Sequence, residues 1–272
     1  YGINPETGLH EEEEVMRLAK EHKPKMIICG ASAYPRQIDF KMFRRVADEV
    51  GAYLFADVAH YAGLIVGGAY EGPVGLADVI TSTTHKTLRG PRGGIILSSA
   101  EMMKQINKTV FPGLQGGPIM NSIAAKAVAF QEALQPSFKD YAHQVVRNSK
   151  LLASEMMKRG YKLISGGTDS HMMLFDFRNT EMTGKLAEET LGKVGITINK
   201  NSVPHDPRPP MVTSGIRIGT PAITSRGFGE PEMLVVADCI DSALKNHADD
   251  AALAKVKGKV RELCAAYPMY RD

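Results

Sequence analysis

The sequence has few cysteines, no excess of charge of one sign and no long apolar run. Its three cysteines, Cys29, Cys239 and Cys264, form no C-x-x-C pair. This excludes a disulfide framework and a cysteine zinc site as organising features and favours a reducing cytoplasm. Lys and Arg number 33 and Asp and Glu 30, a net charge of +3, so nothing points to nucleic acid as a partner. No run approaches the roughly 20 apolar residues of a spanning helix, so we expect no membrane segment.

What remains is ordinary globular composition, with 43% hydrophobic and 23% charged residues. A chain of 272 residues is long enough to bury a core. At about 150 residues per domain it predicts one or two domains.

The first half of the chain alternates between helix and strand patterns. Residues 39–50 repeat apolar side chains at helical spacing and stop at Gly51. Short apolar segments predict strands at 25–29, 52–55, 77–80 and 94–97. This pattern predicts an α/β fold, with a parallel, doubly wound sheet covered on both faces. Ligands of such sheets lie at the carboxyl ends of the strands, which directs attention to Ser32, 57–60 and 83–86.

From Pro118 onward the pattern changes to α+β. Two long helices are predicted up to about Gly160. Further segments follow as a strand at 172–177, a helix at 184–193, short strands at 196–198 and 216–218, and helices at 230–245 and 250–266. We therefore predict a larger domain over residues 1–136 and a smaller C-terminal domain over residues 137–272.

Asp57 ends one of the predicted buried strands. A carboxylate in that position is costly unless a cation or hydrogen-bond donors compensate it. A helix cap or a structural salt bridge would satisfy it, and a D-x-x-H metal site with His60 is a third alternative. No further metal ligand lies nearby in the sequence, so we expect no metal.

Lys86 lies among hydroxyl groups and a histidine directly after the next strand, in the segment 81–87. A single lysine is usually a solvated surface charge. At a strand's carboxyl end, however, an amine can form a Schiff base with an aldehyde. Pyridoxal phosphate requires such a lysine, an Asp opposite its ring nitrogen and a phosphate cradle. Asp57 and Lys86 supply two of these three requirements.

Several segments together resemble serine hydroxymethyltransferase. They are SAYPR at 32–36, ADVAHYAGLI at 56–65, TTHKTLRGPRGG at 83–94, FPGLQGGP at 111–118, NKNSVP at 199–204 and SGIRIGTPA at 214–222. The resemblance covers the whole chain. It implies a fold type I pyridoxal-phosphate enzyme, with a mostly parallel large domain followed by a smaller α+β domain.

The resemblance also implies a role for each matching residue. Lys86 would hold pyridoxal 5'-phosphate covalently, and Asp57 would pair with the pyridine nitrogen. His60 and Ser32 would lie near the cofactor's phenolic oxygen, and His60 also near the substrate. Thr83 and His85 would handle protons and orient the neighbouring lysine. Arg92 would hold the cofactor region in place.

Five further residues carry implied roles in binding. Arg217 matches the arginine that takes the substrate carboxylate, for which a guanidinium fork is suited and an ammonium is not. Asn201 and Ser202 match part of the folate site. Gly116 and Gly117 match a pair that approaches the cofactor phosphate of a neighbouring subunit, which implies a homodimer or homotetramer with a shared site.

The implied activity is the interconversion of serine and tetrahydrofolate with glycine and 5,10-methylenetetrahydrofolate. A threonine aldolase would share Lys86 and Asp57, but segment 199–204 argues against it. A catalytically silent binding or regulatory subunit is the other alternative, and the presence of every expected site residue argues against it.

Length sets one further expectation. Family members are longer, Tyr1 is not an initiator methionine, and the chain matches about the C-terminal two thirds of the family. We therefore expect an N-terminal part of the large domain to be missing, two open sheet edges, and a chain that is inactive alone, poorly soluble and a weak binder of the cofactor.

Overall fold

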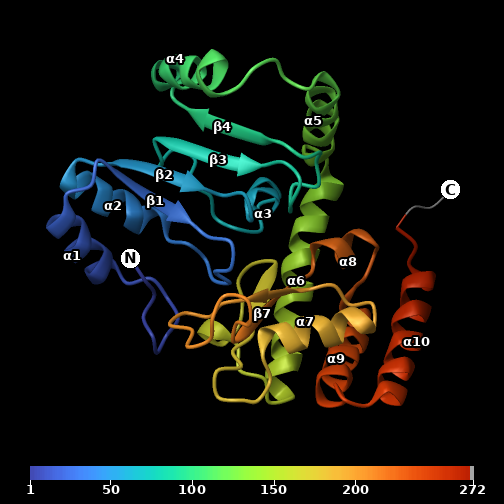
Figure 1. Ribbon diagram of the computed structural model, residues 1–272. Helices are drawn as coiled ribbons and strands as arrows, with labels where there is room; N and C mark the ends of the chain where they lie inside the picture. Colours follow the sequence, from blue (N-terminus) through green and yellow to red (C-terminus); the bar gives the residue numbers. More distant parts are fainter. Residues whose placement is uncertain (270–272) are drawn as a thin grey trace. The chain divides into compact units, whose positions relative to one another are not determined.

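The computed structural model describes residues 1–269, which form two compact units (Figure 1). The first unit comprises residue 1 and the segments 10–32 and 37–142. The second comprises the segments 2–9 and 33–36 and the chain from 143 onward. The sequence places the boundary at 136, whereas these units divide after residue 142, within helix α6 (Pro136–Lys158). Because that helix is continuous, no linker composition marks the division.

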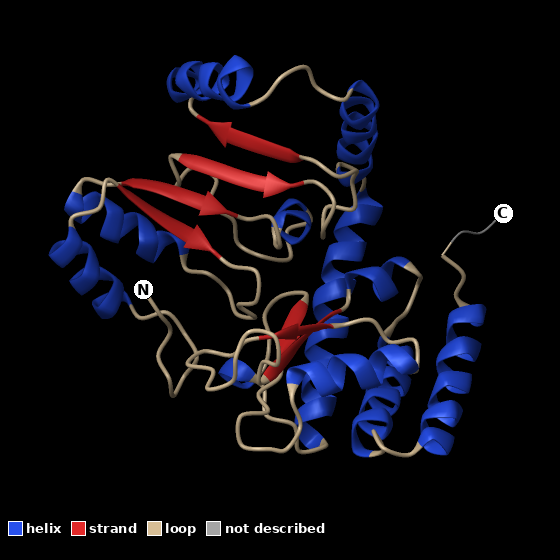
Figure 2. Ribbon diagram, viewed as in Figure 1, coloured by secondary structure: helices blue, strands red, loops and turns tan. Residues whose placement is uncertain are grey.

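A four-stranded sheet forms the centre of the first unit (Figure 2). Its strands, in spatial order, are β1 (Met26–Gly30), β2 (Tyr53–Asp57), β3 (Val79–Thr83) and β4 (Gly94–Ser98). The first three are parallel, which confirms the predicted α/β class with a mostly parallel sheet. Strand β4 runs antiparallel to β3 and is the exception to the parallel order that the alternating pattern predicts. The connection at 84–93 contains no helix, and a parallel pair needs a long crossover.

The helical segments of this unit are, in chain order, α1 (Glu12–His22), α2 (Phe40–Val50), α3 (Ala62–Val66), α4 (Ala100–Lys108), a short irregular turn (Thr109–Leu114) and α5 (Met120–Ala133). The predicted helix before Gly51 is confirmed. Asp39 caps its start by accepting a hydrogen bond from the Met42 amide at 2.9 Å. Gly51 ends it at φ 67°, a left-handed conformation that glycine adopts readily.

One face of the sheet is buried and the other is largely open. Helix α2 packs against β1 and β2, and alternate residues such as Ile27 and Leu54 are buried. On the opposite face, Met26, Ile28 and Tyr53 have exposed fractions of 43%, 59% and 54%. Within residues 1–269, the prediction that both faces are covered is therefore wrong.

The second unit is α+β, as predicted. Its sheet has the order β5 (Met172–Leu174), β7 (Gly215–Gly219) and β6 (Asn199–Asn201), with antiparallel pairs. Its helices are the rest of α6, a single turn (Ile164–Gly166), α7 (Gly184–Lys193), α8 (Pro221–Ser225), α9 (Glu230–Lys245) and α10 (Asp250–Ala266). The predicted bounds of α7, α9 and α10 are confirmed. Their apolar stripes meet the sheet in one core that includes Met173, Phe175, Leu191, Ile216 and Ile240.

Two predicted strands of this unit differ from the structure. The strand expected at 172–177 is confined to β5. The strand expected at 196–198 is absent, and β6 begins at Asn199. The amide of Ile196 donates to the carbonyl of Leu191 at 2.9 Å. This hydrogen bond caps α7. Since the Ile196 amide is used at the helix end, it is not available to a sheet ladder, and no strand forms at 196–198.

Candidate active site

Two parallel strand pairs bring the carboxyl ends of β1, β2 and β3 to one edge of the sheet. The register places Gly30 beside Asp57, and Asp57 beside Thr81. Gly30 has φ 134°, and a Cβ atom on it would clash with the carbonyl oxygen of Asp57. A residue without a side chain is therefore required where β1 and β2 end.

The Asp57 side chain is exposed at this edge. Its Oδ1 accepts a hydrogen bond from the Ala59 amide at 3.0 Å, which stabilises the turn leading to His60. The carboxylate thus has the local capping role that was one of the alternatives from sequence. It also lies where a ligand at the strand ends could reach it.

The loop that carries Lys86 is held in place by its own backbone and by Thr84. The Thr84 hydroxyl is buried and donates to the carbonyl of Pro91 at 2.6 Å. Its amide donates to the carbonyl of Gly93 at 3.0 Å, and its carbonyl accepts from the Gly90 amide at 2.7 Å. These bonds close the β3–β4 loop, defined here as residues 84–93, and hold its backbone around Lys86.

Thr87 ties this loop to the turn that carries His60. Its hydroxyl donates to the carbonyl of His60 at 2.9 Å and accepts from the Gly63 amide at 3.0 Å. The Tyr141 hydroxyl donates to the carbonyl of Thr87 at 3.3 Å. A Cβ atom on Gly63 would overlap the carbonyl of Thr87, so α3 packs directly on the loop. The backbones at His60 and Lys86 are therefore fixed relative to each other.

Two polar atoms beside Lys86 are buried without a partner in the part of the chain that the structure describes. They are the Oγ1 of Thr83 and the Nδ1 of His85. An unsatisfied buried polar atom costs about 1–3 kcal/mol, so such atoms mark a place where a further group belongs. Burial and the nearby charges of Arg92 and Lys86 lower the pKa of His85. Its ring is therefore neutral near pH 7 and can donate or accept a hydrogen bond.

The other predicted cofactor residues of the first unit lie near the same strands. Ser32 is exposed two residues after β1. Arg92, Gly116 and Gly117 line a hollow of about 750 Å³ bounded by β4, α4 and α5. A Cβ atom on either glycine would meet nothing within 4 Å. The close approach implied for this pair is therefore not made to the chain itself.

Arg217 lies on β7, the middle strand of the second unit's sheet. It is partly exposed, whereas Ile216 and Ile218 on either side are buried. Its Nη2 donates to the Oδ1 of Asn199 across the β6–β7 pair at 3.1 Å. Because an amide is neutral, this bond orients the guanidinium without cancelling its charge.

The two predicted folate residues lie at the end of β6. Asn201 donates from Nδ2 to the carbonyl of Ser202 at 2.7 Å, and Ser202 is exposed. Asn199 was not predicted as a site residue. It could have been found only from the pairing of residues 199–201 with residues 215–217, which places Asn199 opposite Arg217. That pairing depends on the register of β6, which the sequence does not display.

The part of the chain that the structure describes has neither a metal-ligand cluster nor a membrane-spanning helix. Residues 1–269 contain no group of three His, Cys, Asp or Glu side chains placed to hold a metal ion. Among the same residues, no helix combines the length and apolar character needed to cross a bilayer.

Comparison with known proteins identifies the family. The family model described as serine hydroxymethyltransferase matches residues 1–240. A serine hydroxymethyltransferase from Myxococcus xanthus (strain DK1622) is 56% identical over 270 residues, which is 99% of this chain and 65% of the relative. The chain thus spans slightly less than two thirds of the length of the curated relative it matches.

Proposed function

The chain belongs to the serine hydroxymethyltransferase family, whose members have the type I pyridoxal-phosphate fold, and from this premise we propose that it is a transferase of one-carbon metabolism. The proposed reaction interconverts serine and tetrahydrofolate with glycine and 5,10-methylenetetrahydrofolate, a step of amino-acid biosynthesis. The observation that carries the proposal is the hydrogen-bonded loop that presents Lys86 beside two unpartnered buried polar atoms.

The residues present fit pyridoxal 5'-phosphate. When bound, the cofactor supplies an aldehyde that condenses with amines and a ring that accepts an electron pair. Lys86 provides the amine to hold it covalently. The carboxylate of Asp57, at the end of the neighbouring strand, is the group to hold a proton on the ring nitrogen. The orphaned atoms of Thr83 and His85 gain partners if the site is filled.

The remaining residues of the first unit orient these groups. The turn that holds His60 is fixed through Thr87, so its imidazole can be placed reproducibly against cofactor and substrate. Ser32 provides a hydroxyl at the same edge of the sheet. Arg92 adds positive charge beside His85, which keeps that ring neutral and able to move a proton.

Arg217 is the proposed binding group for the carboxylate of serine or glycine. Its guanidinium can donate two parallel hydrogen bonds to a carboxylate, and Asn199 fixes its direction. Asn201 and Ser202 are the proposed contacts to the folate co-substrate. The amino acid and the folate would therefore be bound by neighbouring strands of one small sheet.

We further propose that the protein is a homodimer or homotetramer that shares its active site between subunits. Helix α5 and the segments on either side of it expose large apolar side chains, and an extended exposed apolar patch marks an interaction surface. Leu114, Ile119, Met120 and Leu134 have exposed fractions of 80%, 71%, 68% and 76%. A second copy covering this surface would reach Gly116 and Gly117, beside which there is open space.

A reducing cytoplasm is the proposed location. Cys29, Cys239 and Cys264 are all free thiols, and Cys29 and Cys239 are buried. Serine, glycine and folate are the proposed partners, and the proposal includes no nucleic acid or membrane.

Borohydride reduction followed by peptide mass mapping tests the assignment. The chain is incubated with pyridoxal phosphate in two preparations. One contains the chain alone, and the other also contains the part of the relative that lies outside the match. We expect the pyridoxyl adduct on Lys86 and none on Lys126, a lysine of the same unit that donates to the carbonyl of Gly94. An adduct elsewhere, or none in either preparation, contradicts the proposal. Formation of glycine from serine only when tetrahydrofolate is present separates this enzyme from a threonine aldolase.

A further inference from the structure

The loop that joins β6 to β7 connects the two strands that carry the proposed substrate groups. We define the β6–β7 loop as residues 202–214. It follows Asn201 directly and ends three residues before Arg217. The conformation of this loop therefore governs how β6 and β7 are joined, and with them the Asn199–Arg217 pair.

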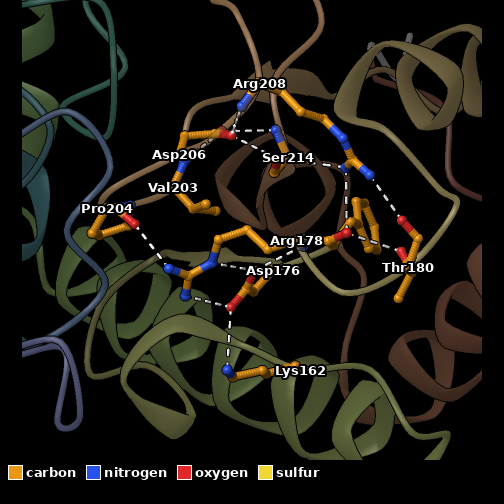
Figure 3. Close-up of polar contacts among 10 residues, drawn as sticks. Lys162, Asp176, Arg178, Thr180, Val203, Pro204, Asp206, Arg208 and Ser214 are labelled. Atoms are coloured by element: carbon orange, nitrogen blue, oxygen red, sulfur yellow. Dashed lines mark hydrogen bonds and ion pairs between the residues drawn. The ribbon is translucent and has the colours of Figure 1, made fainter.

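One carboxylate closes this loop at both ends (Figure 3). The Oδ2 of Asp206 accepts from the amides of Val203 at 3.1 Å and Ser214 at 2.7 Å. Its Oδ1 accepts from the Arg208 amide at 2.9 Å and the Ser214 hydroxyl at 2.6 Å. All four hydrogen bonds come from the loop itself. Asp206 thus joins Val203, near the start of the loop, to Ser214, its last residue, through a single side chain.

Arg208 attaches the same loop to the segment before α7. Its Nη2 donates to the carbonyl of Thr180 at 2.8 Å (Figure 3). Its Nη1 donates to the carbonyl of Met182 at 2.9 Å. The Asp206 carboxylate accepts hydrogen bonds from amides and a hydroxyl of the loop, and the Arg208 guanidinium donates to backbone carbonyls. The two side chains thereby satisfy backbone groups that have no partner in a sheet ladder.

An ion pair between Arg178 and Asp176 holds the start of the loop. Arg178 donates from Nη1 to the carbonyl of Pro204 at 3.0 Å and from Nη2 to Asp176 at 2.7 Å. Asp176 is buried and also pairs with Lys162 at 3.4 Å (Figure 3). The loop is therefore fixed at Pro204 by a cation that is itself held by a buried carboxylate.

Two residues of the loop have left-handed backbones that side chains disfavour. His205 has φ 55° and Thr213 has φ 57°. They lie next to Asp206 and next to Ser214, at the two points that the carboxylate joins. A residue keeps such a conformation only where the surrounding contacts hold it there. The hydrogen bonds to Asp206 are contacts of this kind.

The hydrogen bonds also keep Asp206 charged. Burial by itself would raise the pKa of this carboxyl, but the bonds from Ser214, Arg208 and Val203 hold it below its ordinary value. An ionised acceptor forms stronger hydrogen bonds than a neutral one. The closure of the loop is therefore maintained throughout the neutral pH range.

We propose that Asp206 is a positioning residue for amino-acid binding, which acts by closing the β6–β7 loop and so setting where Arg217 and Asn199 lie. The inference rests on the proposed function in one respect, namely that Arg217 binds the carboxylate of serine or glycine. The four hydrogen bonds that Asp206 accepts all come from its own loop, so its effect on the ligand passes through β7.

Asp206→Asn is the informative variant because it preserves shape and replaces one acceptor oxygen with an NH2 group that faces donors. Asp238→Asn is the matched control. Asp238 is a carboxylate of the same unit that pairs with Arg159 at 2.6 Å, but it lies on α9 with a side chain that is 64% exposed. Ser214→Ala serves as a milder second variant because it removes one of the four hydrogen bonds and leaves the backbone amide in place.

Hydrogen exchange of the chain, with pyridoxal phosphate supplied, gives the first measurement. We expect Asp206→Asn to reduce the protection of the Val203 and Ser214 amides at least tenfold and Ser214→Ala to reduce it less. Exchange in α9, α10 and the first unit should be unchanged. Unchanged protection of the loop, or an equal loss throughout the second unit, overturns the proposal. If Asp206→Asn does not fold, Ser214→Ala decides the same question.

Titration with glycine gives the second measurement. Displacing a binding group by about 1 Å can cost up to about a hundredfold, so we expect glycine affinity to fall ten- to a hundredfold in Asp206→Asn. The adduct on Lys86 should form normally in that variant, and Asp238→Asn should bind glycine like the wild type. Wild-type affinity in Asp206→Asn overturns the proposal. A wild type that binds no glycine even when the unmatched part of the relative is supplied would contradict the proposed function. The exchange data would still decide whether Asp206 closes the loop.

Discussion

The β3–β4 loop of the first unit and the β6–β7 loop of the second have the same connectivity and opposite hydrogen-bond balance. Each joins an antiparallel pair and lies beside a proposed binding group, Lys86 in one and Arg217 in the other. Beside Lys86, the buried polar atoms of Thr83 and His85 have no partner within residues 1–269. In the other loop, Asp206 accepts four hydrogen bonds.

This difference separates a site that receives a ligand from a support that orients one. Unpartnered buried groups are costly unless something else satisfies them, so they indicate where a cofactor belongs. A fully hydrogen-bonded carboxylate has little left to offer a ligand, and its contribution is to hold geometry. Changes in the first loop should therefore affect chemistry and cofactor, and changes in the second should affect substrate affinity.

The largest effect is expected from Asp57→Asn, which removes the charge at the strand end and keeps the shape. In protein that turns over serine, we expect kcat to fall by about 10²–10³, the cost of losing one preorganised electrostatic partner. Cofactor binding, measured by absorption, should weaken much less. The Asn side chain can still accept the bond from the Ala59 amide, so turnover near the wild-type level would show that Asp57 is only a cap.

Arg217→Lys should have the next largest effect. It keeps the positive charge but loses the planar fork, and we expect the KM for serine to rise by about a hundredfold, or about 2.8 kcal/mol. Kinetics at saturating folate measure this change. Arg147→Lys is the control, because Arg147 is an exposed arginine that bonds only Gln144 among the contacts described. Equal KM values for the two variants would move the carboxylate site elsewhere.

Thr87→Val tests how the β3–β4 loop is held in place. It leaves the carbonyl of His60 and the amide of Gly63 without their buried partner, so we expect the free energy of unfolding to fall by about 2 kcal/mol. Denaturant titration followed by circular dichroism measures it. Thr109→Val also removes a hydroxyl that donates to a carbonyl, that of Gln105, at an exposed position. It should change stability by less than about 0.5 kcal/mol, and similar losses in both variants would argue against the role of Thr87.

The smallest effect is a pH dependence that belongs to the second loop. The folded-state pKa of Asp206 is lowered, so its stabilisation is present above the unfolded pKa of about 3.9 and is lost as pH falls through the folded value. We expect the free energy of unfolding of the wild type to exceed that of Asp206→Asn by about 1 kcal/mol between pH 5 and 7. The difference should shrink below about pH 4, measured by thermal unfolding across pH. A difference that grows in acid would show that the carboxylate does not hold the loop as an anion.

Local patterns were sufficient to predict much of the molecule. Helices α7, α9 and α10 have the bounds expected from apolar spacing and caps. The strand ends predicted that Asp57 and the segment leading to Lys86 would share one edge of a sheet, and the register places them there. These features depend on periodicity within about 20 residues, which a sequence displays directly.

Other features depend on partners distant in sequence, and only the tertiary structure determined them. The direction of β4, the start of β6 and the membership of segments 2–9 and 33–36 in the second unit are all of this kind. So are the pairing of Asn199 with Arg217 and the closure of a loop by Asp206. The sequence by itself determined which residues lie near the strand ends and which chemistry they can perform. Which backbone donors those side chains satisfy was decided by the fold, because hydrogen-bond partners are selected by proximity in space.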